Sequence, residues 1–400
     1  MEPRQLFGTV ETVAGPAEAF VCSDLDRPNE VMFHWFSPNL KRAVLCTLQE
    51  NRQGLQFTPT HLYYVSDIGA LYLPRKLTTE ELNELKSTRG TLVRTLSGGL
   101  DGTWTNGSGQ SGRIQLSVLP ANQFPRALTA DECKTWDEFK DWAHQIRSKH
   151  EGTWFRGHGC SRLPLMTSLM RTGRTRLERY CSAELAQFTA HAEAVLNQRL
   201  SLDNPSDYAI ILGLARHHGL PTPMTDWTLS PYIAAFFAFS DVLDVARPDS
   251  TNVRIYALSG KFLAMRSPPR VTVPHVSPYF VGIEISPVHN PRLYAQQGRF
   301  LVSNVADLET HIHIAETLSH EQHLFAADVP RECAVEALED LSFMGLTAAT
   351  MFPGLDGVGK MIRHRMSFRN PPLPPPMEGP QIVKDANPKG LPPSDTPSAN

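Results

Sequence analysis

Short apolar runs bounded by turn residues dominate the first 120 residues of the chain. Residues 30–36 (EVMFHWF) and 61–73 (HLYYVSDIGALYL) are rich in aromatic and β-branched side chains, which favours β-strands. In residues 112–119, Ile114, Leu116 and Val118 alternate with polar or small residues, a period typical of a strand with one buried face. The pattern predicts a β-rich segment.

Two local signals refine this β-rich segment. Asn106-Gly107 is a tight-turn pair, so residues 100–104 and 113–119 are expected to form a hairpin. Residues 78–90 (TTEELNELKSTRG) predict one amphipathic helix, with Leu82 and Leu85 buried and Gly90 just past its end.

Beyond residue 130 the apolar period changes to that of helices. In residues 135–150, Trp136, Phe139, Trp142 and Ile146 recur at helical spacing and predict a buried aromatic face. Further helices are expected at 174–200, 206–219, 332–345 and within 347–366, and strands at 154–155, 252–260, 279–287 and after 296. Arg156-Gly157 is expected where the strand at 154–155 opens into a loop. The fold class predicted from these patterns is α+β.

The stretch from His217 to Val242 joins polar, conformationally fixed residues to an apolar run. Gly219 is expected to end one helix, and Pro221 and Pro223 to fix the following turn. Thr228 or Ser230 would cap a new helix that has proline in its first turn. The N-terminus of such a helix suits an anion such as phosphate, although Asp226, Thr228 and Ser230 serving only as caps explains the same pattern.

Composition and charge narrow the classes of function. The 400 residues carry a formal net charge of -3, so no global basic field attracts nucleic acid. Six scattered cysteines indicate a reduced chain better than a disulfide scaffold or a zinc site. No secretory signal or membrane-length apolar run is apparent, so we expect a cytoplasmic protein without a membrane partner.

Composition also divides the chain. We expect a β-rich N-terminal domain at 1–125, a mixed α/β domain at 130–368, and a disordered tail at 369–400, where residues 371–400 contain 10 prolines.

The histidines offer one candidate metal site. His311 and His313 would share a face if residues 311–314 form a strand, and could then ligate zinc; the same residues are equally typical of a half-exposed strand without metal. His217 and His218, adjacent at a helix end, point about 100° apart, which is awkward for one ion. We therefore predict no metal site.

Five motifs, in order along the chain, resemble the FRG domain family. They are WFRG (154–157), HHGLPT (217–222), DWTLSPYIAAFFAF (226–239), QQGRF (296–300) and MFPGLDGV (351–358). The resemblance covers about residues 135–365 and implies a mixed α/β FRG domain. His158, Arg216 and residues 223–225 depart from the family's usual residues.

The same residues show a weaker resemblance to arginine-dependent ADP-ribosyltransferases. It implies that Arg156 binds the pyrophosphate of NAD, that Thr228 and Ser230 orient the ribose, and that Gln297 stands where those enzymes carry a catalytic glutamate. Gly157, His218, Asp226 and Trp227 are the further candidate cofactor-binding residues. Glu284 and Glu321 are alternative acids.

Two functions from different classes follow from these resemblances. The first is an NAD-binding, ADP-ribosyltransferase-like or NAD-hydrolysing effector in bacterial anti-phage defence, with a protein or nucleic-acid acceptor. The second is a non-catalytic nucleotide- or nucleic-acid-binding module that regulates a partner. The order of Arg156, Thr228 and Ser230 favours the first, and glutamine at 297 favours the second.

Overall fold

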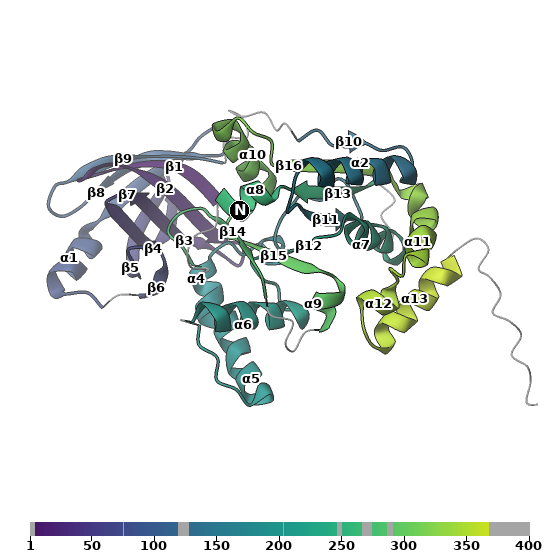
Figure 1. The fold of residues 1–400 in the computed structure, drawn as a ribbon. Helices are drawn as coiled ribbons and strands as arrows, with labels where there is room; N and C mark the ends of the chain where they lie inside the picture. Colours follow the sequence, from purple (N-terminus) through teal and green to yellow (C-terminus); the bar gives the residue numbers. More distant parts are fainter. Residues whose placement is uncertain are drawn as a thin grey trace, which may run out of the picture.

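The protein has an N-terminal β-barrel and a C-terminal mixed α/β part, which lie side by side (Figure 1). The computed structural model describes residues 5–74, 76–118, 128–202, 204–245, 250–265, 274–285 and 291–367. The α+β fold class is confirmed. The boundary residues 119–127 and the tail predicted at 369–400 lie outside the described residues.

The barrel consists of eight antiparallel strands in the order β4-β3-β2-β1-β9-β8-β7-β5, and pairing of β5 with β4 closes it. The strands are β1 (Gln5–Thr12), β2 (Gly15–Asp24), β3 (Arg27–Ser37), β4 (Leu40–Asn51), β5 (Gly54–Val65), β7 (Arg89–Arg94), β8 (Leu100–Thr105) and β9 (Ser111–Ser117). A short strand β6 (Leu71–Pro74) pairs with β5, and helix α1 (Thr79–Ser87) lies at one end of the barrel (Figure 1). The predicted β8–β9 hairpin is confirmed.

Strand alternation explains why both faces of some barrel strands are buried. Val31 and Phe33 face the barrel interior, whereas Met32 lies in a second cluster on the outer face with Phe20 and Val276. Val276 belongs to the C-terminal part, so the outer face of β2–β4 is covered by it. The unbroken apolar character of residues 31–33 results from this two-sided burial.

The C-terminal part contains a seven-stranded sheet in the order β10-β16-β13-β11-β12-β15-β14. The strands are β10 (Asp131–Glu132), β11 (Trp154–His158), β12 (Met224–Thr228), β13 (Asn252–Leu258), β14 (Phe280–Ile283), β15 (Gly298–Ser303) and β16 (Leu324–Pro330). Only β10 and β16 pair in parallel among the described strands.

Helices cover this sheet in separate groups (Figure 1). Helices α2 (Trp136–Lys149), α7 (Pro231–Asp244) and α11 (Ala334–Phe343) pack with β11, β13 and β16, and the short helix α12 (Ala348–Met351) joins them. A second group packs with β12, β14 and β15: α3 (Ser168–Arg171), α4 (Leu177–Tyr180), the π-helical turn Cys181–Leu185, α6 (Pro205–His217) and α9 (Pro291–Ala295). Helices α5 (Ala186–Leu196), α8 (Gly260–Met265), α10 (Leu308–Ser319) and α13 (Leu355–Ser367) complete the described helices.

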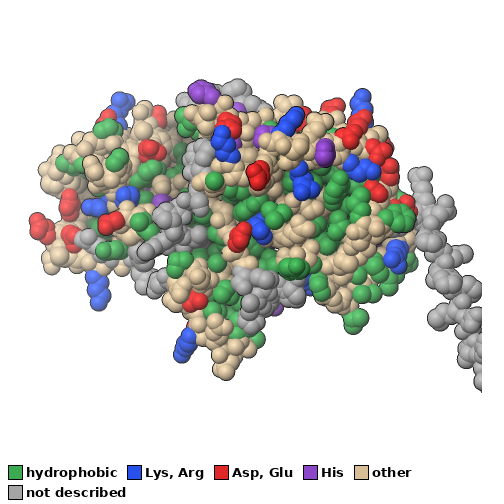
Figure 2. Space-filling view, in the orientation of Figure 1, with side chains coloured by type: hydrophobic (Ala, Val, Ile, Leu, Met, Phe, Trp, Pro, Cys, Tyr) green, Lys and Arg blue, Asp and Glu red, His purple; other side chains and the backbone are tan. Residues whose placement is uncertain are grey.

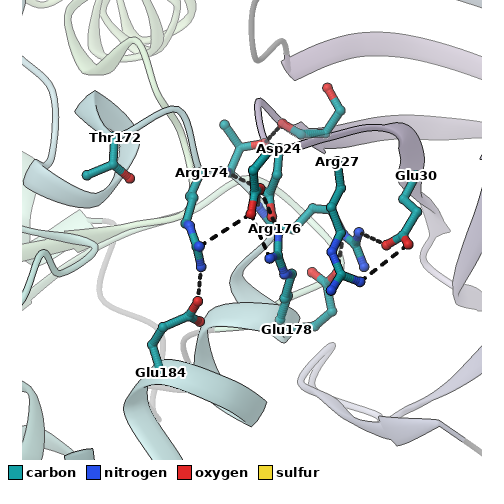
Figure 3. Close-up of polar contacts among 12 residues, drawn as sticks. Asp24, Arg27, Glu30, Thr172, Arg174, Arg176, Glu178 and Glu184 are labelled. Atoms are coloured by element: carbon teal, nitrogen blue, oxygen red, sulfur yellow. Dashed lines mark hydrogen bonds and ion pairs between the residues drawn. The ribbon is translucent and has the colours of Figure 1, made fainter.

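A buried ionic cluster joins the barrel to the C-terminal part (Figure 3). Asp24, at the end of β2, accepts hydrogen bonds from the backbone N–H groups of Thr175 (2.8 Å) and Arg176 (3.0 Å), and from Arg179 Nη1 (2.9 Å). Arg176 in turn donates to Glu30 of β3 (2.7 Å) and to Glu178 (2.7 Å). The side chains of Asp24 and Arg176 are 1% and 3% exposed, so these two charges are paired with their partners away from solvent.

Three predicted details of the barrel segment are wrong. Helix α1 has no buried residue, because it lies over the barrel end rather than inside the core, and Leu82 is 37% exposed. Gly90 does not terminate this helix: Thr88 does, and Gly90 is inside β7. Val118 lies beyond the end of β9 and is exposed, so it does not continue the buried row of Ile114 and Leu116.

The C-terminal part differs from the sequence-based expectation at four points. Residues 224–228 form β12, a strand that was not predicted, and Arg156-Gly157 lies inside β11 rather than in a loop. Residues 311–314 belong to α10, which begins after the N-cap Asp307, and not to a strand. The helix expected at 174–200 is interrupted by the π-helical turn. Among the described residues, no helix is long and apolar enough to cross a bilayer.

Candidate functional site

The candidate site is a cavity of about 330 Å³ where strands β11 and β12 separate. The register between these strands holds one pair among the described residues, Phe155 with Thr228. Helix α6 supplies Gly213, Arg216 and His217 to the cavity wall, and α7 supplies Ala234 and Phe237. The cavity therefore lies between two helices, beside a break in the central sheet.

Arg156 spans this break. Its Nη1 donates to the backbone carbonyl of Asp226 (2.6 Å), and its Nε donates to His158 Nε2 (3.0 Å). The side chain is 13% exposed, and burial lowers its pKa to about 10, which still leaves it charged at neutral pH. Burial and the charge of Arg156 lower the pKa of His158 well below its ordinary value, so His158 is neutral and can accept this hydrogen bond.

Asp226 lies between two guanidinium groups. Arg216 contacts both of its carboxylate oxygens, with Nε donating to Oδ1 at 3.1 Å, and Arg156 Nη1 lies 3.7 Å from Oδ2. Burial alone would raise the pKa of Asp226, but the charges of Arg216 and Arg156 lower it below the ordinary value. Arg216 also donates to Ser168 Oγ (2.6 Å), which ties α6 to α3. The carboxylate is therefore ionised, and its charge is balanced within the site.

Two more arginines line the cavity from the side of β15. Arg292 lies over the ring of Phe352, with 5.6 Å between its guanidinium carbon and the ring centroid. Arg299 pairs with Glu284 (3.1 Å), whose side chain is 73% exposed. Four arginines and one carboxylate line the cavity, so positive charges exceed negative ones by three among these residues. Such a cavity favours an anionic ligand.

The N-terminus of α7 is capped as the sequence predicts. Ser230 is the N-cap, its Oγ accepts from the N–H of Ile233 (3.4 Å), and Pro231 follows in the first turn. Thr228 Oγ1 accepts from the N–H of Ser230 (3.2 Å) and lines the cavity, whereas Ser230 does not line it. Both hydroxyl groups thus have a structural role in the turn between β12 and α7.

Gly157 allows α7 to lie directly on β11. A Cβ atom at this position would be 2.0 Å from the carbonyl oxygen of Ala234. Because no side chain fits in this space, glycine is required by the close approach of helix and strand. Gly157 and the buried Trp227 line the cavity, and Trp227 directs its indole N–H to Thr225 Oγ1 (2.8 Å).

Gln297 and His218 are not among the residues that line the cavity. Gln297 has a left-handed backbone (φ 47°), and its carbonyl accepts from the N–H of Leu229 (3.4 Å). Its neighbour Gln296 lines the cavity and donates to the carbonyl of Met351 (2.9 Å). His218 is the C-cap of α6, with its ring against His217, which does line the cavity.

The alternative acids have other partners. Glu284 pairs with Arg299 at the rim, and Glu321 pairs with Lys261 (2.5 Å). In the part of the chain that the structure describes, no three histidine, cysteine or acidic side chains are grouped as a metal would require. His311 instead packs against the rings of Phe7 (4.9 Å) and Phe280 (5.8 Å), and burial lowers its pKa to about 4.

Sequence reasoning found part of this site. Arg156, Gly157, Asp226, Trp227 and Thr228 line one cavity, although 72 positions separate the first from the last. It missed the cavity-lining roles of Arg292, Arg299, Gln296 and Phe352. Gln296 and Arg299 belong to the QQGRF motif, and Phe352 belongs to MFPGLDGV. The available signal was therefore the motifs themselves, with the two arginines at 292 and 299 in or near QQGRF.

Comparison with protein families matches residues 151–246, from the turn before β11 to just past α7, to the FRG domain. No curated protein and no solved structure in the comparison matches the chain. The comparisons give no support to an ADP-ribosyltransferase resemblance. The matched residues include Arg156, Arg216, Asp226 and the cap of α7, and the protein therefore contains an FRG domain.

Proposed function

We propose that the cavity of the FRG domain binds a nucleotide through its phosphate groups, with NAD as the first candidate. The observation that carries this proposal is the excess of guanidinium groups: Arg156, Arg216, Arg292 and Arg299 line the cavity, and Asp226 is the one carboxylate that lines it with them. Guanidinium groups bind phosphate oxygens in a bidentate manner and stay charged at neutral pH.

The rest of the lining suits the other parts of a nucleotide. Phe237 and Phe352 supply aromatic surface for a base, and Thr228 supplies a hydroxyl beside the capped N-terminus of α7. The volume of about 330 Å³ is within the range of small-molecule sites. An extended dinucleotide would place one of its halves in the cavity and the other at its rim.

Cleavage of NAD is the second candidate, and Asp226 is the residue that favours it. It is the one carboxylate among the lining residues, and it is ionised as a group that stabilises a ribosyl cation must be. Its charge is balanced by Arg216 and Arg156, however, which reduces what it offers to a developing cation. Binding is therefore the better supported function. A role in bacterial anti-phage defence, with a protein or nucleic-acid acceptor, is a proposal that rests on the family resemblance.

The variant Asp226→Asn separates binding from cleavage. It keeps an oxygen that accepts from Arg216 but removes the negative charge, so NAD and ADP should bind on the order of tenfold more tightly in calorimetric titrations. If the protein cleaves NAD with Asp226 as the acid, the same variant should lose nicotinamide release. Asp328→Asn is the matched control, because Asp328 forms a similar two-bonded pair with Arg254 (2.6 and 2.7 Å) in the same sheet, and neither residue lines the cavity.

Each outcome decides between the two candidates. Saturable binding without nicotinamide release supports the binding module. Release that is lost in Asp226→Asn and kept in Asp328→Asn supports cleavage. If the folded wild-type protein binds neither NAD nor ADP, the nucleotide proposal is wrong.

A further inference from the structure

The interior of the N-terminal barrel is filled unevenly. At the end where β1 begins and β2 ends, the interior is packed with the side chains of Leu6, Leu48, Leu55, Leu92 and Leu116. Toward the other end the structure has a cavity of about 480 Å³. Eight-stranded barrels are just wide enough either to be filled by their own side chains or to hold one small ligand. This barrel combines both arrangements, one at each end.

The buried part of the cavity wall is apolar and comes from β1, β3, β4, β5 and β9. Val10, Phe33, Val44, Cys46, Phe57 and Ile114 line it, and each is at most 6% exposed. Burial raises the pKa of the Cys46 thiol to about 12, so it stays uncharged and adds no ionic group to the wall. An ionic ligand group would find no partner at this depth and would remain at the mouth.

Two tryptophan side chains form part of the cavity wall. Trp35 and Trp104 are both half-buried and line it from β3 and β8. Trp104 donates its indole N–H to the carbonyl of Glu11 (2.8 Å), which fixes the ring in place. Indole and phenyl rings that line one cavity favour an aromatic ligand, because offset-stacked and edge-to-face ring contacts add to the burial of apolar area.

Helix α1 covers the mouth. Glu81, Glu84, Leu85 and Thr88 line the cavity from this helix, and Asn106 Nδ2 of the β8–β9 turn donates to Glu84 (3.2 Å). The helix has no buried residue and lies at the end of the barrel that points away from the C-terminal part in Figure 1. A helix without buried residues is held by few apolar contacts, which favours its opening at low cost.

We propose that the N-terminal barrel binds a small, uncharged aromatic molecule, which enters under α1 and lies against Trp35 and Trp104. The aromatic body occupies the apolar chamber, and any polar group of the ligand stays at the rim beside Arg42, Glu81, Glu84 and Asn106. This site is separate from the FRG cavity, and the two sets of lining residues share no member.

The proposal can be tested with N-phenyl-1-naphthylamine, a neutral aromatic dye whose fluorescence rises in apolar surroundings. We expect saturable binding at one site per chain by the full-length protein, with energy transfer from tryptophan. Val44→Trp, which fills the chamber, should weaken dye binding at least tenfold. Thr103→Trp adds the same indole to the exposed outer face of β8 and should bind the dye as the wild type does.

Folding of each variant is checked by circular dichroism and thermal unfolding. If Val44→Trp misfolds, the smaller substitution Val44→Phe takes its place and should weaken binding severalfold. The proposal is overturned if the folded wild-type protein shows no saturable signal, or if a folded chamber-filling variant and Thr103→Trp bind the dye equally well.

Discussion

Arg156 Nη1 donates a 2.6 Å hydrogen bond to the backbone carbonyl of Asp226 from the neighbouring strand. Beyond the single register pair of Phe155 and Thr228, this side chain, and no described backbone pair, connects β11 to β12. Arg156 therefore has two roles: it bridges the break in the sheet and contributes positive charge to the cavity.

Replacing Arg156 with lysine should lower the affinity for NAD and ADP by 10- to 100-fold. Lysine keeps the charge but loses the planar fork, so it cannot hold the Asp226 carbonyl with one nitrogen and direct a second nitrogen to a phosphate. Isothermal titration measures the affinity, and Arg254→Lys is the control, because Arg254 lies on the neighbouring strand outside the cavity. Equal affinities in the two variants would contradict a ligand-binding role for Arg156.

Gly157→Ala should destabilise the protein by several kcal/mol. The added Cβ would lie 2.0 Å from the carbonyl oxygen of Ala234, so α7 would have to move away from β11. Denaturant unfolding followed by circular dichroism measures the loss. The control is Gly359→Ala in α13, where a Cβ meets no atom within 4 Å and alanine favours the helix by about 1 kcal/mol.

Asp24→Ala should cost about 3 to 5 kcal/mol of stability, since it leaves the buried N–H groups of Thr175 and Arg176 without their acceptor and removes the buried one of the two carboxylates that pair with Arg179. Asp26, also a partner of Arg179 but with 46% of its side chain exposed, is the matched control. Asp26→Ala should cost at most about 1 kcal/mol. Scanning calorimetry of both variants gives the comparison, and similar losses would show that the buried position of Asp24 carries no special weight.

Replacing His34 with phenylalanine should make the free energy of unfolding depend less strongly on pH below pH 6.5. Burial, with a smaller contribution from His275, lowers the pKa of His34 to about 3, and no hydrogen-bond partner reaches its Nδ1 among the described residues. The unfolded chain therefore binds a proton near pH 6.5 that the folded chain does not, and stability falls as the pH decreases from 6.5 toward 3. In His34→Phe, the slope of the free energy of unfolding against pH should be smaller by about 1.4 kcal/mol per pH unit between pH 6 and 4.

Urea unfolding at a series of pH values measures this slope. Phenylalanine suits the position, because the ring of His34 already stacks on Phe20 at 5.3 Å. A variant that loses stability with pH as steeply as the wild type would show that His34 is not the group responsible.

The elements that could be predicted from the sequence are those with one buried face and apolar residues at a regular spacing. The period of Trp136, Phe139, Trp142 and Ile146 placed α2, and Ser230-Pro231 placed the start of α7. Strand β12 was missed because prolines precede it and its polar residues do not alternate with apolar ones. Thr225 and Thr228 are buried there through contacts that only the complete sheet provides. Local propensity carries no information of that kind.

The site residues that could be predicted are those that stand in short sequence motifs. Arg156 and Thr228 were found through their motifs, whereas Arg292 reaches the cavity because α9 returns to the sheet beside Phe352. The barrel cavity was not predicted at all. Its walls come from a segment that was expected to be β-rich. Whether the strands of such a segment close into a barrel, and how far their side chains fill it, depends on strand stagger rather than on any local pattern.

The ionic cluster of Asp24, Arg176 and Arg179 limits how the two parts of this protein can be separated or exchanged in evolution. A gene segment encoding the C-terminal part alone would carry both arginines without Asp24 and Glu30, and would expose a surface built for those acids. Recombination that exchanged the barrel for another domain would face the same mismatch. The two parts are thus expected to pass together from one genome to the next, and their acids and bases to change in concert.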